Sequence, residues 1–286
     1  MKEMTPQEII ENQKQQWNGV APSWEKWDQK LDQNLSFLNH RLIGDAQLRF
    51  GQTVLDLGSG TGFPAVLIAQ TVGEKGSVTG LDLAESMLTV AREKAQRLGV
   101  TNIQFQQGDI TALPFESNQF DAVTSRFCLM FLPEIPKAIV EIARVLKPGG
   151  YLAAAVWSEP KKNQFVQIPV QALSKIIEFP KPDPNQPGIF RLAPPGELMD
   201  MAKQAGLHGI RDEEVEAESP FDSPDEYYEN LLDLAAPLKP FFEKLTPDQK
   251  KQVETEVKGE IKQFQREDQI FLPMAIRLVT ARKPLG

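Results

Sequence analysis

The chain has 286 residues, 41% of them hydrophobic, and its 39 acidic and 31 basic side chains give a formal net charge of −8. Such a chain can bury a substantial core as one elaborated domain, and its acidity excludes an extended surface for nucleic acid. The single cysteine, Cys128, excludes an internal disulfide framework and is typical of a reducing compartment.

The first 50 residues are expected to form a helical arm. Thr5, Pro6 and Glu8 supply a hydroxyl cap, a proline in the first turn and an acid at the third helical position, which predicts a helix over about 6–18. A second helix is expected over about 31–50.

Three tryptophans, Trp17, Trp24 and Trp27, lie within eleven residues of this arm, and their rings are expected to pack against the core.

Residues 1–16 are polar and lack the apolar segment of a signal peptide, and no run of 18 apolar residues occurs in the chain. We therefore expect a cytoplasmic protein without integral membrane contact.

From residue 51 onward the pattern changes to strands that alternate with helices. Strands are expected near 53–57, 77–82, 103–107, 119–125 and 150–157, and helices near 62–73, 84–98 and 134–146. Alternation with short connections predicts parallel strands joined by right-handed crossovers. Two further strands, near 208–217 and 270–281, would complete a doubly wound, mostly parallel α/β sheet of seven strands.

A glycine-rich turn, with Gly58, Ser59, Gly60 and Gly62, joins the first of these strands to a helix. Such a turn lets a ligand approach bare backbone at the carboxyl end of a parallel strand. No Gly-Lys-Ser/Thr follows, which disfavours a P-loop NTPase. Asp56 precedes the first glycine, where it would repel a pyrophosphate and attract a cation, although it could also merely cap the turn.

A second acid, Asp82, ends the next strand 20 residues after Gly62. From this position a carboxylate can bind a ribose diol. Together with Asp56, it predicts a cationic nucleoside ligand without phosphates. An NAD-dependent oxidoreductase is the alternative with the same strand–helix–strand geometry, but it fits poorly with Asp56 and with this glycine spacing.

Five segments of the chain, in the right order, resemble the class I S-adenosylmethionine-dependent methyltransferases, in particular the small-molecule branch that includes the ubiquinone and menaquinone C-methyltransferases. The resemblance covers roughly residues 50–157, and its segments are 56–62, 80–88, 108–115, 120–123 and 144–150. It implies a Rossmann-like methyltransferase fold with a final antiparallel strand, S-adenosyl-L-methionine as cofactor, and N-terminal helices that form a lid over the active site.

The same resemblance implies roles for particular residues. The glycine turn would hold the methionine part of the cofactor, and Asp82 with the adjoining Leu83 would bind the ribose. Met87 and Ile110 would flank the adenine, and Asp109 would accept its exocyclic amine. Two of these residues have other interpretations, because Met87 has the helical spacing of a core residue and Asp109 follows a glycine, as ordinary turn residues do.

The acceptor side offers few candidates. Residues 124–128 stand in place of the Asn/Asp-Pro-Pro-aromatic box that amino-methylating nucleic-acid enzymes present to a flipped base. Arg126 is expected to contact the cofactor or pair with a substrate anion, unless it forms a structural salt bridge. His40 is the candidate base, or else a surface residue. His208 is expected at the opposite edge of the sheet, and Cys128 as a small buried hydrophobe; no metal site is predicted.

The carboxyl-terminal half is expected to carry additions to the core. We divide the chain into an arm (1–50), a cofactor-binding core (51–158), a segment with a proline-rich loop, a helix and the sixth strand (159–221), a helical insertion (222–266) and a final strand (267–286). Nine aromatic and leucine side chains favour a substrate cap for the insertion, with a separate helical hairpin or a dimer surface as alternatives.

The sequence as a whole predicts an S-adenosylmethionine-dependent methyltransferase that acts at O or C of a small, largely apolar acceptor of aromatic, quinone-like or natural-product type. Such an enzyme mainly has to align the acceptor and exclude water. Because no base is evident, a catalytically silent S-adenosylmethionine-binding partner protein remains the alternative. A monomer or homodimer is expected.

Overall fold

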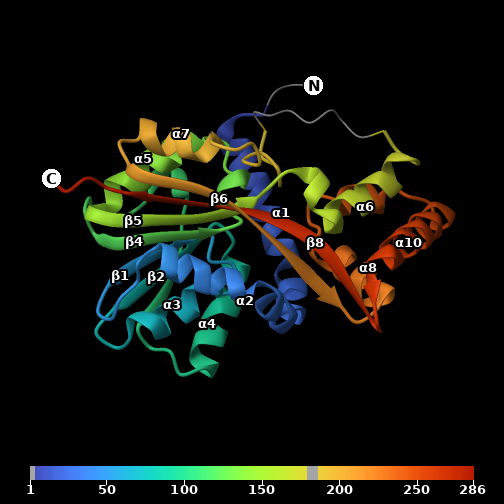
Figure 1. The fold of residues 1–286 in the computed structure, drawn as a ribbon, viewed down its shortest axis with the longest axis horizontal. Helices are drawn as coiled ribbons and strands as arrows, with labels where there is room; N and C mark the ends of the chain where they lie inside the picture. The colour runs from blue at the N-terminus through green and yellow to red at the C-terminus, as the bar shows by residue number, and fades with distance from the viewer. Residues whose placement is uncertain (1–3, 179–185) are drawn as a thin grey trace.

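The computed structural model describes residues 4–178 and 186–286, and its centre is a sheet with helices on both faces (Figure 1). Strand order is β3-β2-β1-β4-β5-β8-β6, and a two-residue strand, β7, pairs with β8. The seven long strands are β1 (Thr53–Leu57), β2 (Ser77–Asp82), β3 (Ile103–Gln107), β4 (Phe120–Arg126), β5 (Leu146–Trp157), β6 (His208–Phe221) and β8 (Gln269–Arg282), with β7 at Gln265–Arg266.

Strands β1 to β5 pair in parallel and β8 runs antiparallel to both β5 and β6, so the predicted doubly wound, mostly parallel sheet is confirmed. The central strands β1, β4 and β5 are mostly buried because both faces of the sheet are covered, whereas β3 is half-exposed. Helices α2 (Asp28–Asp45), α3 (Ala65–Val72) and α4 (Glu85–Arg97) cover one face, and α5 (Ile135–Val145) and α7 (Glu197–Gln204) cover the other (Figure 1).

The arm differs from its predicted boundaries. Helix α1 spans Pro6–Lys26 and continues through Pro22, and only Trp27 separates it from α2. An interior proline costs about 3 kcal/mol in an isolated helix. Here Val20 and Ala21, next to Pro22, are buried against the first turn of α4, and tertiary packing of this kind outweighs the local preference.

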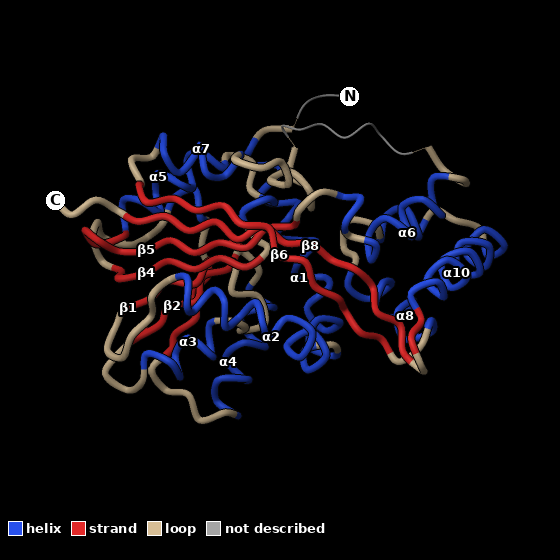
Figure 2. The backbone as a smooth tube through the Cα atoms, in the orientation of Figure 1, coloured by secondary structure: helices blue, strands red, loops and turns tan. Residues whose placement is uncertain are grey.

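Strands β6 and β8, 14 residues each, extend beyond the core and carry a second group of helices at their outer ends (Figure 2). These helices are α6 (Gln164–Ser174), α8 (Pro224–Leu234), α9 (Lys239–Glu243) and α10 (Pro247–Ile261). They share a hydrophobic core of their own with the strand ends, including Leu173, Phe221 and Val257. Most of the proline-rich loop, 179–185, lies outside the described residues.

Candidate active site

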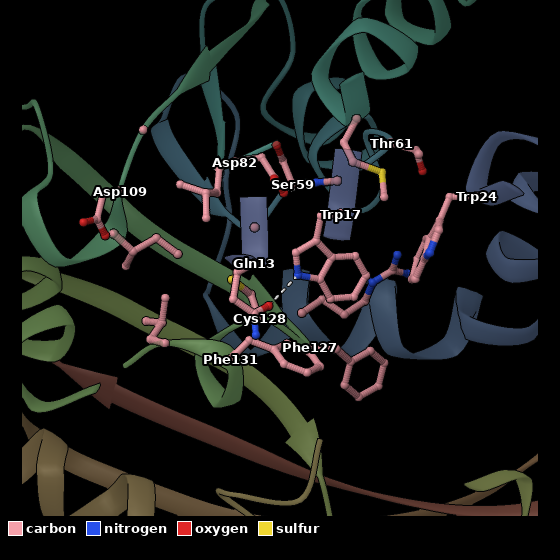
Figure 3. A pocket seen from close by; sticks show the side chains of 18 of the residues that line it. Gln13, Trp17, Trp24, Ser59, Thr61, Asp82, Asp109, Phe127, Cys128 and Phe131 are labelled. Carbon is pink, nitrogen blue, oxygen red and sulfur yellow. Dashed lines mark hydrogen bonds between the residues drawn. The ribbon is translucent and has the colours of Figure 1, made fainter. Parts of the chain in front are cut away.

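A cavity lies at the carboxyl ends of β1, β2, β3 and β4, where the ends of parallel strands meet, and the arm helix α1 covers it (Figure 3). The arm contributes Ile10, Gln13, Trp17, Trp24 and Leu35 to its lining. The strand ends contribute Gly58–Thr61, Phe63, Asp82, Leu83, Met87, Gly108–Ile110, Arg126–Cys128 and Phe131–Pro133. Nearly all the residues predicted to bind the cofactor are therefore brought together.

The glycine turn has a conformation that other residues resist. Gly58 has φ +67°, and a Cβ atom there would lie 2.4 Å from the Cβ and Sγ atoms of Cys128. The backbone N–H groups of Gly58 and Ser59 both donate to the carbonyl of Leu81, at 2.8 and 3.1 Å. Gly62 does not line the cavity; it faces Ala91 of α4 and lets this helix pack closely behind the turn.

Asp82 connects the turn to the next strand. Its carboxylate accepts hydrogen bonds from the N–H groups of Gly60 and Ala84, both at 2.9 Å, and it lines the cavity. Burial raises the pKa of Asp82, against the opposing effect of these two N–H groups. Asp82 therefore fixes the turn and also presents a carboxylate to the cavity.

Asp56 lies beneath the turn, 1% exposed and outside the cavity lining. Strand register places it opposite Thr124 of β4, whose hydroxyl donates to Asp56 Oδ1 at 2.6 Å. Burial raises the pKa of Asp56 to about 7, although the Thr124 hydrogen bond and the charge of Arg126 lower it. Its Oδ2 atom and the hydroxyl of Ser59 are buried without a hydrogen-bond partner among the described residues.

For Met87 and Asp109 the structure supports both interpretations of the sequence. Met87, 3% exposed, packs against the buried Val20 and Ala21 of the arm and also lines the cavity. Asp109 lines the cavity beside Ile110, while its carboxylate accepts from the N–H and the hydroxyl of Thr111, both at 2.8 Å. Asp109 is thus a turn residue whose side chain also lines the cavity.

Arg126 ends β4 and lines the cavity. Its guanidinium donates to Asn39 Oδ1 at 2.8 Å and to the carbonyl of Phe63 at 2.9 Å. Among the residues that the structure describes, no carboxylate lies within 4.0 Å of it, so the alternative of a structural salt bridge does not hold. The half-buried guanidinium is instead held by neutral acceptors at the edge of the cavity.

The structure does not bring His40 to the cavity. Its neighbour Asn39 faces inward to Arg126, and the next position on a helix points about 100° away, so His40 is exposed on α2. His208 is exposed at the start of β6, as expected. Cys128 sits against Gly58, and burial raises the pKa of its thiol.

Sequence reasoning missed a buried ion pair that fixes the arm. Lys94 of α4, 1% exposed, donates to Asp28 Oδ1 at the start of α2, and the Thr61 hydroxyl donates to the same oxygen at 3.1 Å. The ammonium of Lys94 also lies 4.1 Å from the ring centroid of Phe63. In the sequence Lys94 resembles an ordinary surface lysine, and nothing local distinguishes it.

A second unforeseen feature is the aromatic wall. The ring of Trp17 packs edge-to-face against Trp24 and Phe131, with centroids 5.9 and 5.4 Å apart. Phe127 has φ +56°, an unfavourable conformation for a bulky residue, and stacks on Trp157 with centroids 4.0 Å apart. The tryptophans of the arm were visible in the sequence, but the rings that they pack against were not.

The helical insertion does not line this cavity. None of the described lining residues belongs to 222–266, and the cap in contact with the substrate stays a prediction. The insertion contacts the arm: Lys26 pairs with Glu229 and Asp233 of α8, and the indole N–H of Trp27 donates to Asp233 at 2.8 Å. Ala236 of the insertion is buried in one cluster with Val20 of the arm and Met87 of α4.

Fold and site together define a doubly wound α/β protein with a nucleoside-type site at the switch in strand order. A family model described as a methyltransferase domain matches residues 49–181. The demethylmenaquinone methyltransferase of Staphylococcus aureus is 32% identical over 212 residues, which cover 69% of this chain and 87% of that protein. The chain belongs to the class I S-adenosylmethionine-dependent methyltransferases, and S-adenosylmethionine is its cofactor.

Solved structures show the same fold at lower identity. The YcgJ protein of Bacillus subtilis has a TM-score of 0.57 at 21% identity, covering 87% of this chain and 98% of its own. The [4+2]-cyclase SpnF has a TM-score of 0.56 at 21% identity, covering 94% and 96%. Because a cyclase shares the fold, the fold does not by itself define the reaction.

The site fits a cationic nucleoside cofactor. Ser59 lines the cavity, and its Oγ is a buried polar atom that no described residue satisfies; such atoms are rare unless a ligand or water completes them. Acidic side chains predominate among the charged groups around the turn. None of the described helices is long and apolar enough to span a membrane.

Proposed function

We propose that this enzyme transfers a methyl group from S-adenosylmethionine to an oxygen or carbon atom of a small, largely apolar acceptor that is aromatic or quinone-like. The observation that carries the proposal is the wall opposite the glycine turn, which consists of apolar and aromatic side chains. This wall contains Leu35, Trp17, Trp24, Phe127, Phe131, Leu132 and Pro133. The relative named demethylmenaquinone methyltransferase supports a quinone-like acceptor.

For the cofactor we propose the residues that the sequence indicated. Gly58, Ser59 and Gly60 would hold the methionine part, because the two glycines let a ligand approach the backbone closely. Asp82 and Leu83 would bind the ribose, and Asp109, Ile110 and Met87 would surround the adenine. Asp56 would contribute from beneath the turn as a negative charge that favours a cation.

S-adenosylmethionine supplies an electrophilic methyl group and leaves as S-adenosylhomocysteine when the acceptor forms its new bond. The aromatic wall excludes water and holds the acceptor flat, which aligns the nucleophilic atom. The acceptor must also lose a proton, and neither histidine lines the cavity. We propose that Arg126, a cation without a carboxylate partner, stabilises the acceptor as an oxyanion, so that its proton passes to solvent.

Methyl transfer to a panel of reduced 1,4-naphthoquinol, catechol and a simple monophenol tests this proposal, with products identified by mass spectrometry. We expect a methylated naphthoquinol, and NMR of the product separates ring-carbon from oxygen methylation. Arg126→Gln should reduce turnover while the affinity for S-adenosylhomocysteine stays within about twofold, since its neutral partners remain. If wild-type protein binds S-adenosylhomocysteine but methylates nothing in the panel, the proposed acceptor class is wrong.

A catalytically silent cofactor-binding protein is the second candidate, and the absence of a histidine among the described residues that line the cavity motivates it. It predicts binding of S-adenosylmethionine with no methylated product from any acceptor. Methylation of one panel member excludes it.

A further inference from the structure

The three tryptophans of the arm differ in what their indole N–H groups do. Trp17 Nε1 donates to Gln13 at 3.0 Å, and Trp27 Nε1 donates to Asp233 at 2.8 Å. Trp24 Nε1 is buried and has no hydrogen-bond partner among the described residues. A buried donor left unpaired costs about 1–3 kcal/mol, so a native structure seldom retains one without a use.

Trp24 is also a wall of the cavity, and its surroundings hold the indole in place. Its ring packs edge-to-face on Trp17, and α1 is fixed on both sides of it. On one side Asn18 Oδ1 accepts the N–H of Ser86 at 2.9 Å, and on the other Asp28 pairs with Lys94. The donor is therefore positioned before any ligand arrives, which reduces the entropy lost on binding.

The position of Trp24 indicates which part of a ligand it meets. Figure 3 shows Trp24 at the end of the cavity opposite Asp109, with Trp17 between them. If Asp109 marks the adenine end, Trp24 lies at the end where the amino-acid part of the cofactor and the acceptor would meet. Arg126, a lining cation without a carboxylate partner, favours oxygen with negative charge in the same cavity.

We propose that Trp24 is a ligand-binding residue whose indole N–H donates a hydrogen bond to an oxygen atom of a bound molecule. An indole donates and does not accept, so it selects an oxygen over a hydrocarbon group or an amine. Two molecules can supply this oxygen: the cofactor through its carboxylate, and the acceptor through a hydroxyl or oxyanion. Only the second source rests on the proposed function.

NMR of ¹⁵N-indole-labelled protein tests the proposal directly. The chain has four tryptophans, and single Trp→Phe variants assign the four N–H resonances. S-adenosylhomocysteine is added first, with 5′-deoxy-5′-methylthioadenosine, which lacks the amino-acid part, as its control. Phenol is then added to the first complex, with toluene as the matched ligand that lacks oxygen.

We expect the Trp24 resonance to move downfield in one of these two steps and not with its control. Movement with S-adenosylhomocysteine assigns the cofactor carboxylate, and movement with phenol assigns an acceptor oxygen. A Trp24 resonance that stays in place in both steps, or moves equally with toluene, overturns the proposal. Failure of the proposed function looks different, because Trp24 would still respond to a ligand while no panel member is methylated.

Binding to variants gives a second readout. Trp24→Phe should weaken the oxygen-bearing ligand about tenfold relative to Trp17→Phe, since both changes shrink a lining ring but only one removes an unused donor. The affinity for the matched control, 5′-deoxy-5′-methylthioadenosine or toluene, should fall equally in both variants. If both variants lose the same affinity for the ligand as for its control, Trp24 contributes only apolar contacts and the proposal is wrong.

Discussion

Asp56→Asn is the most informative perturbation of this site. Asp56 is 1% exposed, and its neighbours are the Thr124 hydroxyl, the Arg126 cation and the Asp82 carboxyl. Burial raises its pKa from 3.8 to about 7. Asparagine keeps an oxygen that can accept the hydrogen bond from the Thr124 hydroxyl, but its amide does not gain or lose a proton in this pH range. The variant therefore isolates what an ionised Asp56 costs the folded protein.

The direction and size of the effect follow from linkage. Between these two pKa values the folded protein keeps a proton that the unfolded chain releases, so the stabilisation is complete below 3.8 and is lost as the pH rises through about 7. From about pH 5 to about pH 8 the wild-type protein should lose about 2–3 kcal/mol that Asp56→Asn does not lose. Comparing the two pH dependences cancels any constant cost of the new amide.

Urea unfolding of both proteins without ligand, at several pH values across this window, measures the difference. Relative to their values near pH 5, the free energy of unfolding of wild type should fall below that of Asp56→Asn progressively up to about pH 7, and the difference should stay constant above it. Parallel curves for the two proteins would refute the argument that burial raises this pKa. Unchanged m-values are the control that unfolding remains comparable.

Three further outcomes are expected. Asp82→Ala should weaken S-adenosylhomocysteine more than tenfold by calorimetry, because it removes the charged acceptor proposed for the ribose and releases the Gly60 N–H; an unchanged affinity would remove that assignment. Wild-type affinity for the same ligand should fall as the pH drops below about 7, where Asp56 gains a proton, and Asp56→Asn should lack this step. Asp28→Asn should lower the free energy of unfolding by about 3 kcal/mol, because it leaves the ammonium of Lys94, whose side chain is 2% exposed, buried without a charged partner. Lys94→Met should lower it less, because the Asp28 side chain is 17% exposed and stays in contact with water. Urea unfolding measures both, and the reverse order would contradict this reasoning.

Much of the fold could be predicted because it is encoded locally. Apolar runs, glycine spacing and helix-capping residues predicted the strands, the turn at Gly58 and the start of α1, where the Thr5 hydroxyl accepts from the N–H of Glu8. The family resemblance implied that Asp82 and Asp109 bind one cofactor, and both line the cavity at the carboxyl ends of the parallel strands.

What the sequence by itself determined is the sheet, the glycine turn and the cofactor, since each depends on residues that are close along the chain or fixed by strand order. Only the tertiary structure decided the acceptor side. It continued α1 through Pro22, turned His40 outward, buried Lys94 against Asp28 and left the Trp24 N–H without a hydrogen-bond partner among the described residues. These outcomes depend on how α1 and α2 pack across the sheet, and packing between residues distant in the chain leaves no periodic signal in the sequence.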